Sequence, residues 1–253
     1  MLAIDILAAL VIAFSFFTII PMPIIEWPKR RMKIVPLMMP VIGLIAGLIS
    51  YVIYIFLLKF NFTPFFKAVI MCLYYVIFTG GLHIDGLSDA ADAYFSRRDK
   101  AKKLEIMEDS NVGAFAVITL ILFFITKVAV FNEMFSQGIK NSLILIFIPV
   151  ISRLLQSSMI YLFKPAKPDG LARMYGDLDR RYSLIHLFLF VIITVVLYVL
   201  IGVQALMLIV VALAFYAIFY FSSRKQFGGI TGDLLGAFLE ISELIMLGTI
   251  LFI

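Results

Sequence analysis

The chain has little charge and almost no cysteine. Only 15% of its 253 residues are charged, against about a quarter in a soluble domain, and 63% are hydrophobic. The single cysteine, Cys72, excludes an internal disulfide and a zinc site built from several cysteines, and we expect it to pack inertly in an apolar run. No basic face with interleaved aromatic residues is present, which excludes nucleic acid as a partner. The mean hydropathy of +1.09 indicates an integral membrane protein that lies in the lipid bilayer.

Apolar segments of membrane-spanning length fill most of the chain. A transmembrane helix needs about 20 apolar residues, and eight segments qualify, so we predict an all-α, polytopic membrane helix bundle that forms one domain over residues 1–253. The stretch 184–222 is broken only at Gly202 to Gln204. One long tilted helix plus a surface segment there would lower the count to seven. The first segment lacks the basic start of a signal peptide, so we expect it to be retained. The predicted spans are 2–20, 34–58, 65–82, 111–135, 141–163, 184–201, 203–222 and 232–253.

Basic residues are concentrated in alternate loops between the predicted spans. Lysine and arginine in short loops mark the cytoplasmic side of a membrane protein. The first, third, fifth and seventh loops are therefore expected in the cytoplasm of a multi-pass cell-membrane protein, with both termini outside on the eight-span model. The basic residues of these loops are Lys29, Arg30, Arg31 and Lys33; Arg97, Arg98, Lys100, Lys102 and Lys103; Lys164, Lys167, Arg173, Arg180 and Arg181; and Arg224 and Lys225.

Residues 80–92, GGLHIDGLSDAAD, place three carboxylates at the end of a predicted span. Asp85, Asp89 and Asp92 fall within roughly 60° of one face of a helix. Acids packed so closely repel one another and lose hydration near a bilayer, and they persist together when a metal cation lies among them. We therefore predict a short acidic helix at the cytoplasmic face that binds Mg²⁺ or Mn²⁺. The alternative for the acids is a solvated helix on the membrane surface. For His83, the two interpretations are a hydrogen-bond donor behind the metal ligands and a residue that only begins the helix.

A basic turn and further acids follow this helix. The turn, from Arg97 to Lys103, is either an anchor on the cytoplasmic side or a contact for phosphate. Glu105, Glu108 and Asp109 come directly after it, so the acidic character of the region continues beyond the helix.

Residues 228–237, GGITGDLLGA, begin the last predicted span, and Glu240 and Glu243 follow. Asp233 and these two glutamates fit within about 80° of one helical face. Glycines ahead of a helix leave backbone N–H groups free to hold an anion, and small residues let another helix come close. The alternative is small-residue packing with acids that extend to the cytoplasm. The glycines expected at the anion site are Gly229 and Gly232.

Two cations lie in the middle of predicted spans, Lys127 and Arg153. Charges within a membrane are candidates for function. One interpretation is a contact with phosphate or pyrophosphate, and the other is internal ion pairing. The acids considered as partners are Glu240, Glu243 and Glu133. Carboxylates, buried cations and glycine-rich helix starts on one side of the membrane are typical of metal-assisted transfer at a pyrophosphate, with a free carboxylate as base.

At these residues the chain resembles the adenosylcobinamide-GDP ribazoletransferases, also called cobalamin synthases or cobalamin-5′-phosphate synthases. The resemblance covers essentially the whole chain, and its first motif is highly specific. One departure is Asn111-Val112, where the family has a basic residue, and it bears on a phosphate contact only. The matching segments are residues 80–92, 107–110, 228–237 with Glu240 and Glu243, 14–18, Lys127 and Ser152-Arg153.

The resemblance implies a single Mg²⁺-dependent catalytic domain whose site faces the cytoplasm. Adenosylcobinamide-GDP would give its adenosylcobinamide-phosphate moiety to α-ribazole or α-ribazole 5′-phosphate, releasing GMP and forming adenosylcobalamin or its 5′-phosphate late in cobalamin biosynthesis. The predicted catalytic residues are Asp85, Asp89, Asp92, Asp233, Glu240 and Glu243, the predicted metal ligands Asp85, Asp89, Asp92 and Asp109, and the predicted phosphate contacts Lys127, Arg153, Gly229 and Gly232.

Other classes stay open at this point. An aspartate-rich intramembrane prenyltransferase has a similar helix count but a different acid spacing, and the CDP-alcohol phosphotransferases use the same chemistry. A secondary transporter could use buried charges, but it would more often show an inverted repeat, which the chain lacks. The protein could also form a homo-oligomer, but no particular residue indicates its oligomeric state.

Overall fold

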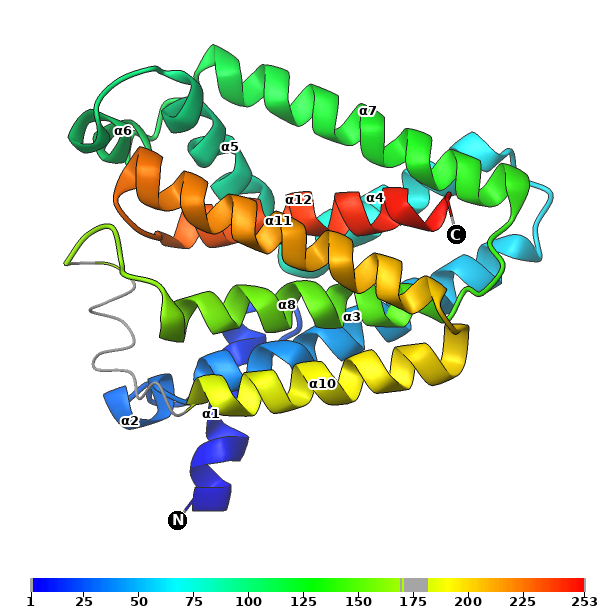
Figure 1. Ribbon diagram of the computed structural model, residues 1–253, viewed down its shortest axis with the longest axis horizontal. Helices are drawn as coiled ribbons and strands as arrows, with labels where there is room; N and C mark the ends of the chain where they lie inside the picture. Colours follow the sequence, from blue (N-terminus) through cyan, green and yellow to red (C-terminus); the bar gives the residue numbers. More distant parts are fainter. Residues whose placement is uncertain (1, 169, 171–181, 253) are drawn as a thin grey trace.

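The computed structural model describes residues 2–168, 170 and 182–252, and these residues form helices joined by loops, with one isolated β-bridge (Figure 1). The all-α prediction is confirmed. Arg173, Arg180 and Arg181, which were predicted as part of the fifth loop, lie outside the described residues. The helices are α1 Leu2–Phe17, α2 Lys29–Met32, α3 Val35–Leu58, α4 Pro64–Thr79, α5 Leu82–Phe95, α6 Lys100–Ile106, α7 Ala114–Gln137, α8 Ile144–Leu162, α10 Tyr182–Ile201, α11 Gln204–Phe227 and α12 Gly232–Ile250.

Each of the eight segments predicted to span the membrane contains a helix, but a count of eight spans is not confirmed. Within the described residues, five helices are long and apolar enough to cross a bilayer (α3, α7, α8, α10 and α11), and α4 with α5 would add a sixth as a bent pair. α1 has only 16 residues, and α12 carries three acids. The stretch 184–222 consists of two helices that meet at Gly202 and Val203, so the alternative of one long helix there is wrong.

The N-terminal end of α1 lies beside the first basic loop. On the eight-span model, the bilayer would separate the two. Asp5, in the first turn of α1, accepts a hydrogen bond from Arg30 at 2.7 Å and pairs with Arg31 at 3.5 Å. At the other end of α1, Phe17 stacks on His83 of α5, with ring centroids 6.2 Å apart. Ion pairs therefore hold the N-terminal end of α1 beside the first basic loop, and the side of the membrane on which the N-terminus lies stays a prediction.

α4 and α5 meet at an angle of 93°. Gly80 and Gly81 form the corner with φ values of 62° and 81°, a backbone conformation that glycine adopts without steric cost. The acidic helix therefore turns away from the axis of α4. It begins against buried residues of α12 instead of continuing a straight span (Figure 1).

α12 is the central helix of the fold. It contacts α5, α7, α8 and α11, and most of its side chains are buried. Phe238, fully buried on α12, stacks on Phe215 of α11 with ring centroids 5.5 Å apart. Because α12 touches so many helices, a residue on it can meet partners that lie far apart in the sequence.

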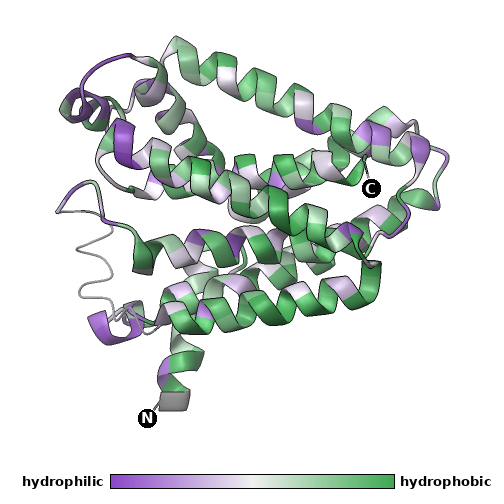
Figure 2. Ribbon diagram, in the orientation of Figure 1, coloured by the Kyte–Doolittle hydropathy of each residue, from purple (hydrophilic) through white to green (hydrophobic). Residues whose placement is uncertain are grey.

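One end of the bundle carries most of the basic loops. α2, α6, the end of α8 and the end of α11 gather there (Figure 1), and Figure 2 shows hydrophilic residues on α2 and α6. α12 begins at this same end, as the apolar helices run back and forth between the two ends. The two acidic motifs are therefore brought to the basic end of the molecule.

Candidate active site where α5 meets α12

A close glycine contact joins the two acidic helices. A Cβ atom on Gly86 of α5 would lie 2.9 Å from both the Cα and the carbonyl oxygen of Asp233 on α12. A Cβ atom on Gly236 would lie 3.2 Å from the carbonyl oxygen of His83. Only glycine leaves room for backbones this close. The motifs that the sequence analysis treated separately therefore form one site.

Acidic side chains of both helices lie near this contact. Asp89 lies within electrostatic reach of Asp85, Asp233 and Asp92, and Asp233 within reach of Asp85 and of Lys167. Asp85 is exposed, while Asp89 and Asp233 are half-buried. Mutual repulsion among partly dehydrated acids favours a bound cation, so the juxtaposition has the electrostatic character that the sequence analysis expected.

α12 begins with a side-chain cap. The hydroxyl of Thr231 accepts a hydrogen bond from the Leu234 N–H at 3.2 Å, which is the ordinary role of threonine ahead of a helix. Asp233 then lies in the first turn, where the helix dipole stabilises its negative charge.

The Asp92 side chain also has a structural role. Its carboxylate accepts hydrogen bonds from the backbone N–H groups of Gly113 at 2.6 Å and Ala116 at 2.8 Å. These groups open α7, whose own N-cap residue, Gly113, has no side chain to accept them. Asp92 therefore fixes the start of α7 against α5.

Asp109 lies in the exposed loop between α6 and α7. Its carboxylate accepts hydrogen bonds from the backbone N–H and the side-chain amide of Asn111, at 3.0 Å and 2.7 Å. These donors lower the pKa of Asp109. The groups that act on its charge are Asn111 and Lys102, and the role of Asp109 as a metal ligand stays a prediction. Asn111, the departure from the family pattern, serves here as its partner.

The donor set suits a hard divalent cation, although the side chains do not converge on one. Within residues 2–168 and 182–252, no group of three or more His, Cys, Asp or Glu side chains has the geometry of a metal site. Asp85, Asp89 and Asp233 still offer carboxylate oxygens, which Mg²⁺ prefers. Among the described residues, the only side-chain hydrogen bond to these three carboxylates is the one that the Thr231 hydroxyl donates to Asp233 Oδ2 at 3.5 Å.

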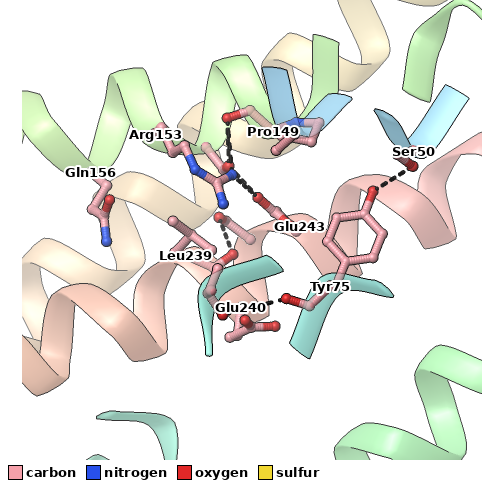
Figure 3. A network of polar contacts seen from close by, with 12 residues as sticks. Ser50, Tyr75, Pro149, Arg153, Gln156, Leu239, Glu240 and Glu243 are labelled. Atoms are coloured by element: carbon pink, nitrogen blue, oxygen red, sulfur yellow. Dashed lines mark hydrogen bonds and ion pairs between the residues drawn. The ribbon is translucent and has the colours of Figure 1, made fainter. Parts of the chain in front are cut away.

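The two intramembrane cations form buried ion pairs with α12. Lys127 Nζ lies 3.1 Å from Glu240 Oε2, and Arg153 Nη1 lies 2.7 Å from Glu243 Oε1. Ser152 donates a further hydrogen bond to Glu243 at 2.7 Å. Figure 3 shows Arg153 reaching across from α8 to Glu243. Internal pairing, one of the two interpretations considered for these cations, is confirmed, and contact with the substrate phosphates stays a prediction.

Some buried polar side-chain atoms have no hydrogen-bond partner among the described residues. Within the described residues these are Arg153 Nε, Glu243 Oε2, Gln156 Oε1 and His83 Nε2. His83 is the second residue of α5 and is buried against Phe17. It therefore begins the helix, as one interpretation had it, and its role as a donor behind the metal ligands is not tested.

The predicted anion-site glycines occupy different surroundings. Gly229 is buried against the backbone of residues 164–166, beside the bridge between Pro165 and Ile230. Gly232, the first residue of α12, is exposed and a Cβ atom there would meet nothing within 4 Å. Gly229 thus has a packing reason to be glycine, while Gly232 leaves its backbone accessible to a ligand.

Lys167, which the sequence marks only as a topology signal, lies beside the candidate site. Its Nζ donates to the Leu104 carbonyl oxygen at 3.0 Å and pairs with Glu108. Lys167 lines a pocket of about 130 Å³ together with Gly232 and Asp233. Its spacing along the chain gives no sign of this, because the contact depends on how the segment after α8 crosses the start of α12.

The chain is similar to known proteins over nearly its whole length. A family model described as cobalamin-5-phosphate synthase matches residues 9–251. An adenosylcobinamide-GDP ribazoletransferase of Clostridium perfringens is 34% identical over 251 residues, 96% of this chain and 98% of that protein. Proteins of the same name from Clostridium botulinum and Clostridioides difficile are 35% and 34% identical, over 93% and 82% of this chain and 94% and 83% of theirs. No solved structure matches the chain.

Proposed function

This chain belongs to the cobalamin-5-phosphate synthase family, and from that premise we infer that it is an adenosylcobinamide-GDP ribazoletransferase of late cobalamin biosynthesis. The donor, adenosylcobinamide-GDP, gives its adenosylcobinamide-phosphate moiety to α-ribazole or to α-ribazole 5′-phosphate. GMP leaves, and adenosylcobalamin or its 5′-phosphate forms. The observation that carries this inference is a family match over nearly the whole chain, with both acidic motifs joined at the Gly86–Asp233 contact.

Asp85, Asp89 and Asp233 are the residues proposed to hold Mg²⁺. Bound there, the ion would neutralise charge on the donor pyrophosphate. Asp85 and Asp89 present their carboxylates from one face of α5, and Asp233 supplies a further ligand or accepts the proton of the acceptor hydroxyl. Asp92 positions α5 relative to α7, because its carboxylate holds the first turn of α7.

Lys167 is proposed as a phosphate contact. Its charge acts on Asp233, and it shares a pocket with the exposed start of α12. Lys127 and Arg153 are proposed to act indirectly. Their pairs with Glu240 and Glu243 hold α12 between α7 and α8, which keeps Asp233 opposite Asp85.

We further propose seven membrane crossings, with the N-terminus and the site in the cytoplasm and the C-terminus outside. The crossings would be α3, the bent α4–α5 pair, α7, α8, α10, α11 and α12. The ion pair of Asp5 with Arg30 supports the cytoplasmic N-terminus. Lysine and arginine in the loops at the same end support the orientation, and both acidic motifs remain on one side.

The function is tested with the purified full-length protein in detergent. Adenosylcobinamide-GDP, α-ribazole and Mg²⁺ are supplied, and GMP and adenosylcobalamin are measured. Equal amounts of the two products are expected. Absence of GMP with either α-ribazole or its 5′-phosphate would overturn the proposed function and leave prenyl transfer or transport to be tested.

A further inference from the structure

A second pocket lies next to the proposed site, at the basic end of the bundle. Its volume is about 460 Å³, within the range of small-molecule sites. It lies between the end of α8 and the end of α11, and residues 228–230 close one side of it. The side chains that give it character are Tyr161, Phe163, Lys164, Tyr220, Ser223 and Arg224.

Aromatic rings form one wall of this pocket. The rings of Phe163 and Tyr220 lie 4.4 Å apart, and Phe163 also contacts Tyr216 at 5.3 Å. Rings held in place by neighbouring rings offer a surface on which a nucleobase can stack, and any base can use it because every base has a π-face.

Two cations stand at the same pocket. Lys164 and Arg224 both line it and both are exposed, so their charged groups are accessible to a ligand. Arg224 lies 3.5 Å from the Tyr220 hydroxyl, which places guanidinium and ring together. Arginine binds phosphate through paired hydrogen bonds, and lysine adds charge. The combination of rings and cations suits a molecule with both an aromatic base and a phosphate.

The pocket is connected to the acids through a short, firmly held piece of backbone. Ile230 pairs with residues 164–166 through two hydrogen bonds, Ala166 N–H to Ile230 O at 2.8 Å and Ile230 N–H to Lys164 O at 3.0 Å. Ile230 lines this pocket and also the smaller pocket that contains Asp233. A ligand in one pocket is therefore a neighbour of a ligand in the other.

The larger cavity between α7 and α11 has a different chemistry. It measures about 500 Å³, and none of its described lining residues is charged. It lies against Leu87, Ala90 and Ala91, on the side of α5 away from the acids. A charged nucleotide would lose its hydration there without compensation, so this cavity is not a competing site.

We propose that the pocket between α8 and α11 binds the nucleoside monophosphate half of the donor, with the base on the Phe163–Tyr220 wall and the phosphate at Arg224 and Lys164. This proposal rests on the proposed function, since it identifies where the leaving group lies. Arg224 and Tyr220 then bind the nucleotide half of the donor and do not contact the acceptor.

Two pairs of variants test this subsite in the full-length protein. Arg224→Ala is compared with Lys225→Ala, which removes the same charge from the next residue, outside the pocket. Tyr220→Leu is compared with Phe221→Leu, whose ring is 66% exposed. The Michaelis constants for donor and acceptor and the inhibition by added GMP are measured, with melting temperatures as a check on folding.

We expect Arg224→Ala and Tyr220→Leu to raise the donor KM and weaken GMP inhibition by about tenfold each, with the acceptor KM unchanged. The two control variants should behave like wild type, and Arg224→Lys should recover part of the loss. Unchanged donor KM and GMP inhibition in an active enzyme would overturn the subsite and leave the function intact. The activity of Arg224→Ala and wild type is also compared with and without vesicles of anionic lipid. If Arg224→Ala changes only the effect of the lipid on activity, the pocket binds a lipid headgroup and the subsite is overturned too. A wild-type protein that releases no GMP would overturn the function itself.

Discussion

Removing one partner of the Lys127–Glu240 pair should destabilise the protein strongly. Glu240→Gln keeps the shape of the side chain and removes its charge. Lys127 would then remain as a cation whose side chain is only 1% exposed, with no carboxylate beside it. The rings of Tyr75 and Phe123, 4.6 Å and 5.0 Å from its Nζ, offset only part of the loss.

The size of the effect follows from the geometry. Opposite charges 3.1 Å apart attract by about 5 kcal/mol at an effective dielectric constant of about 20. Both groups have already lost their hydration, so the net value of the intact pair is smaller. Leaving one charge alone in the interior costs about 3–5 kcal/mol. For a chain of this length that corresponds to a fall in melting temperature of about 6–20 °C.

Thermal unfolding in detergent measures this effect. Glu240→Gln, Lys127→Met and the double variant form a cycle, and the double variant should be more stable than the sum of the single losses predicts. Glu105→Gln is the matched control: it breaks the exposed Lys102–Glu105 pair, and little or no change in melting temperature is expected. A Glu240→Gln protein that melts like wild type but has a much higher donor KM would refute the reasoning and show that Lys127 contacts the substrate.

Three further results are expected. Gly86→Ala should destabilise the protein by about 1–3 kcal/mol and abolish most activity, because its Cβ would lie 2.9 Å from Asp233 backbone atoms. Gly248→Ala, whose Cβ meets nothing within 4 Å, should be harmless. Equal effects of the two variants would contradict the close α5–α12 contact. Asp92→Ala should cost about 1–2 kcal/mol in thermal unfolding, and unchanged stability with weakened Mg²⁺ binding would instead make Asp92 a metal ligand. Cysteines placed at the two termini should react with a membrane-impermeant reagent from opposite sides, and labelling from one side only would rule out seven crossings.

The helices were predictable because apolar runs of the right length leave few alternatives in a bilayer. The path of the chain at Gly80 and Gly81 was less predictable. Two adjacent glycines permit a sharp corner, but they also end helices, and only packing against α12 selects the bend. The position of α1 depended on Asp5 finding Arg30 and Arg31, which hydropathy does not report.

The candidate site was predictable in its residues but not in their pairing. The periodicity of Asp85, Asp89 and Asp92 put them on one face, and the structure places the first two near Asp233. Which acid meets Lys127 and which meets Arg153 depends on the rotation of α12 between α7 and α8. Lys167 could not be distinguished from the other loop cations, because its contact with the start of α12 is tertiary.

Turnover by Asp85→Asn tests the central claim most directly. Asp85 is exposed, and its side chain forms no hydrogen bond or ion pair with another described residue, so the variant should melt like wild type. With adenosylcobinamide-GDP, α-ribazole and saturating Mg²⁺, GMP release is expected to fall at least about a hundredfold, corresponding to about 2.7 kcal/mol of transition-state stabilisation, and chelation of Mg²⁺ should stop the wild-type reaction. A folded Asp85→Asn protein that retains full, Mg²⁺-dependent GMP release would contradict the account.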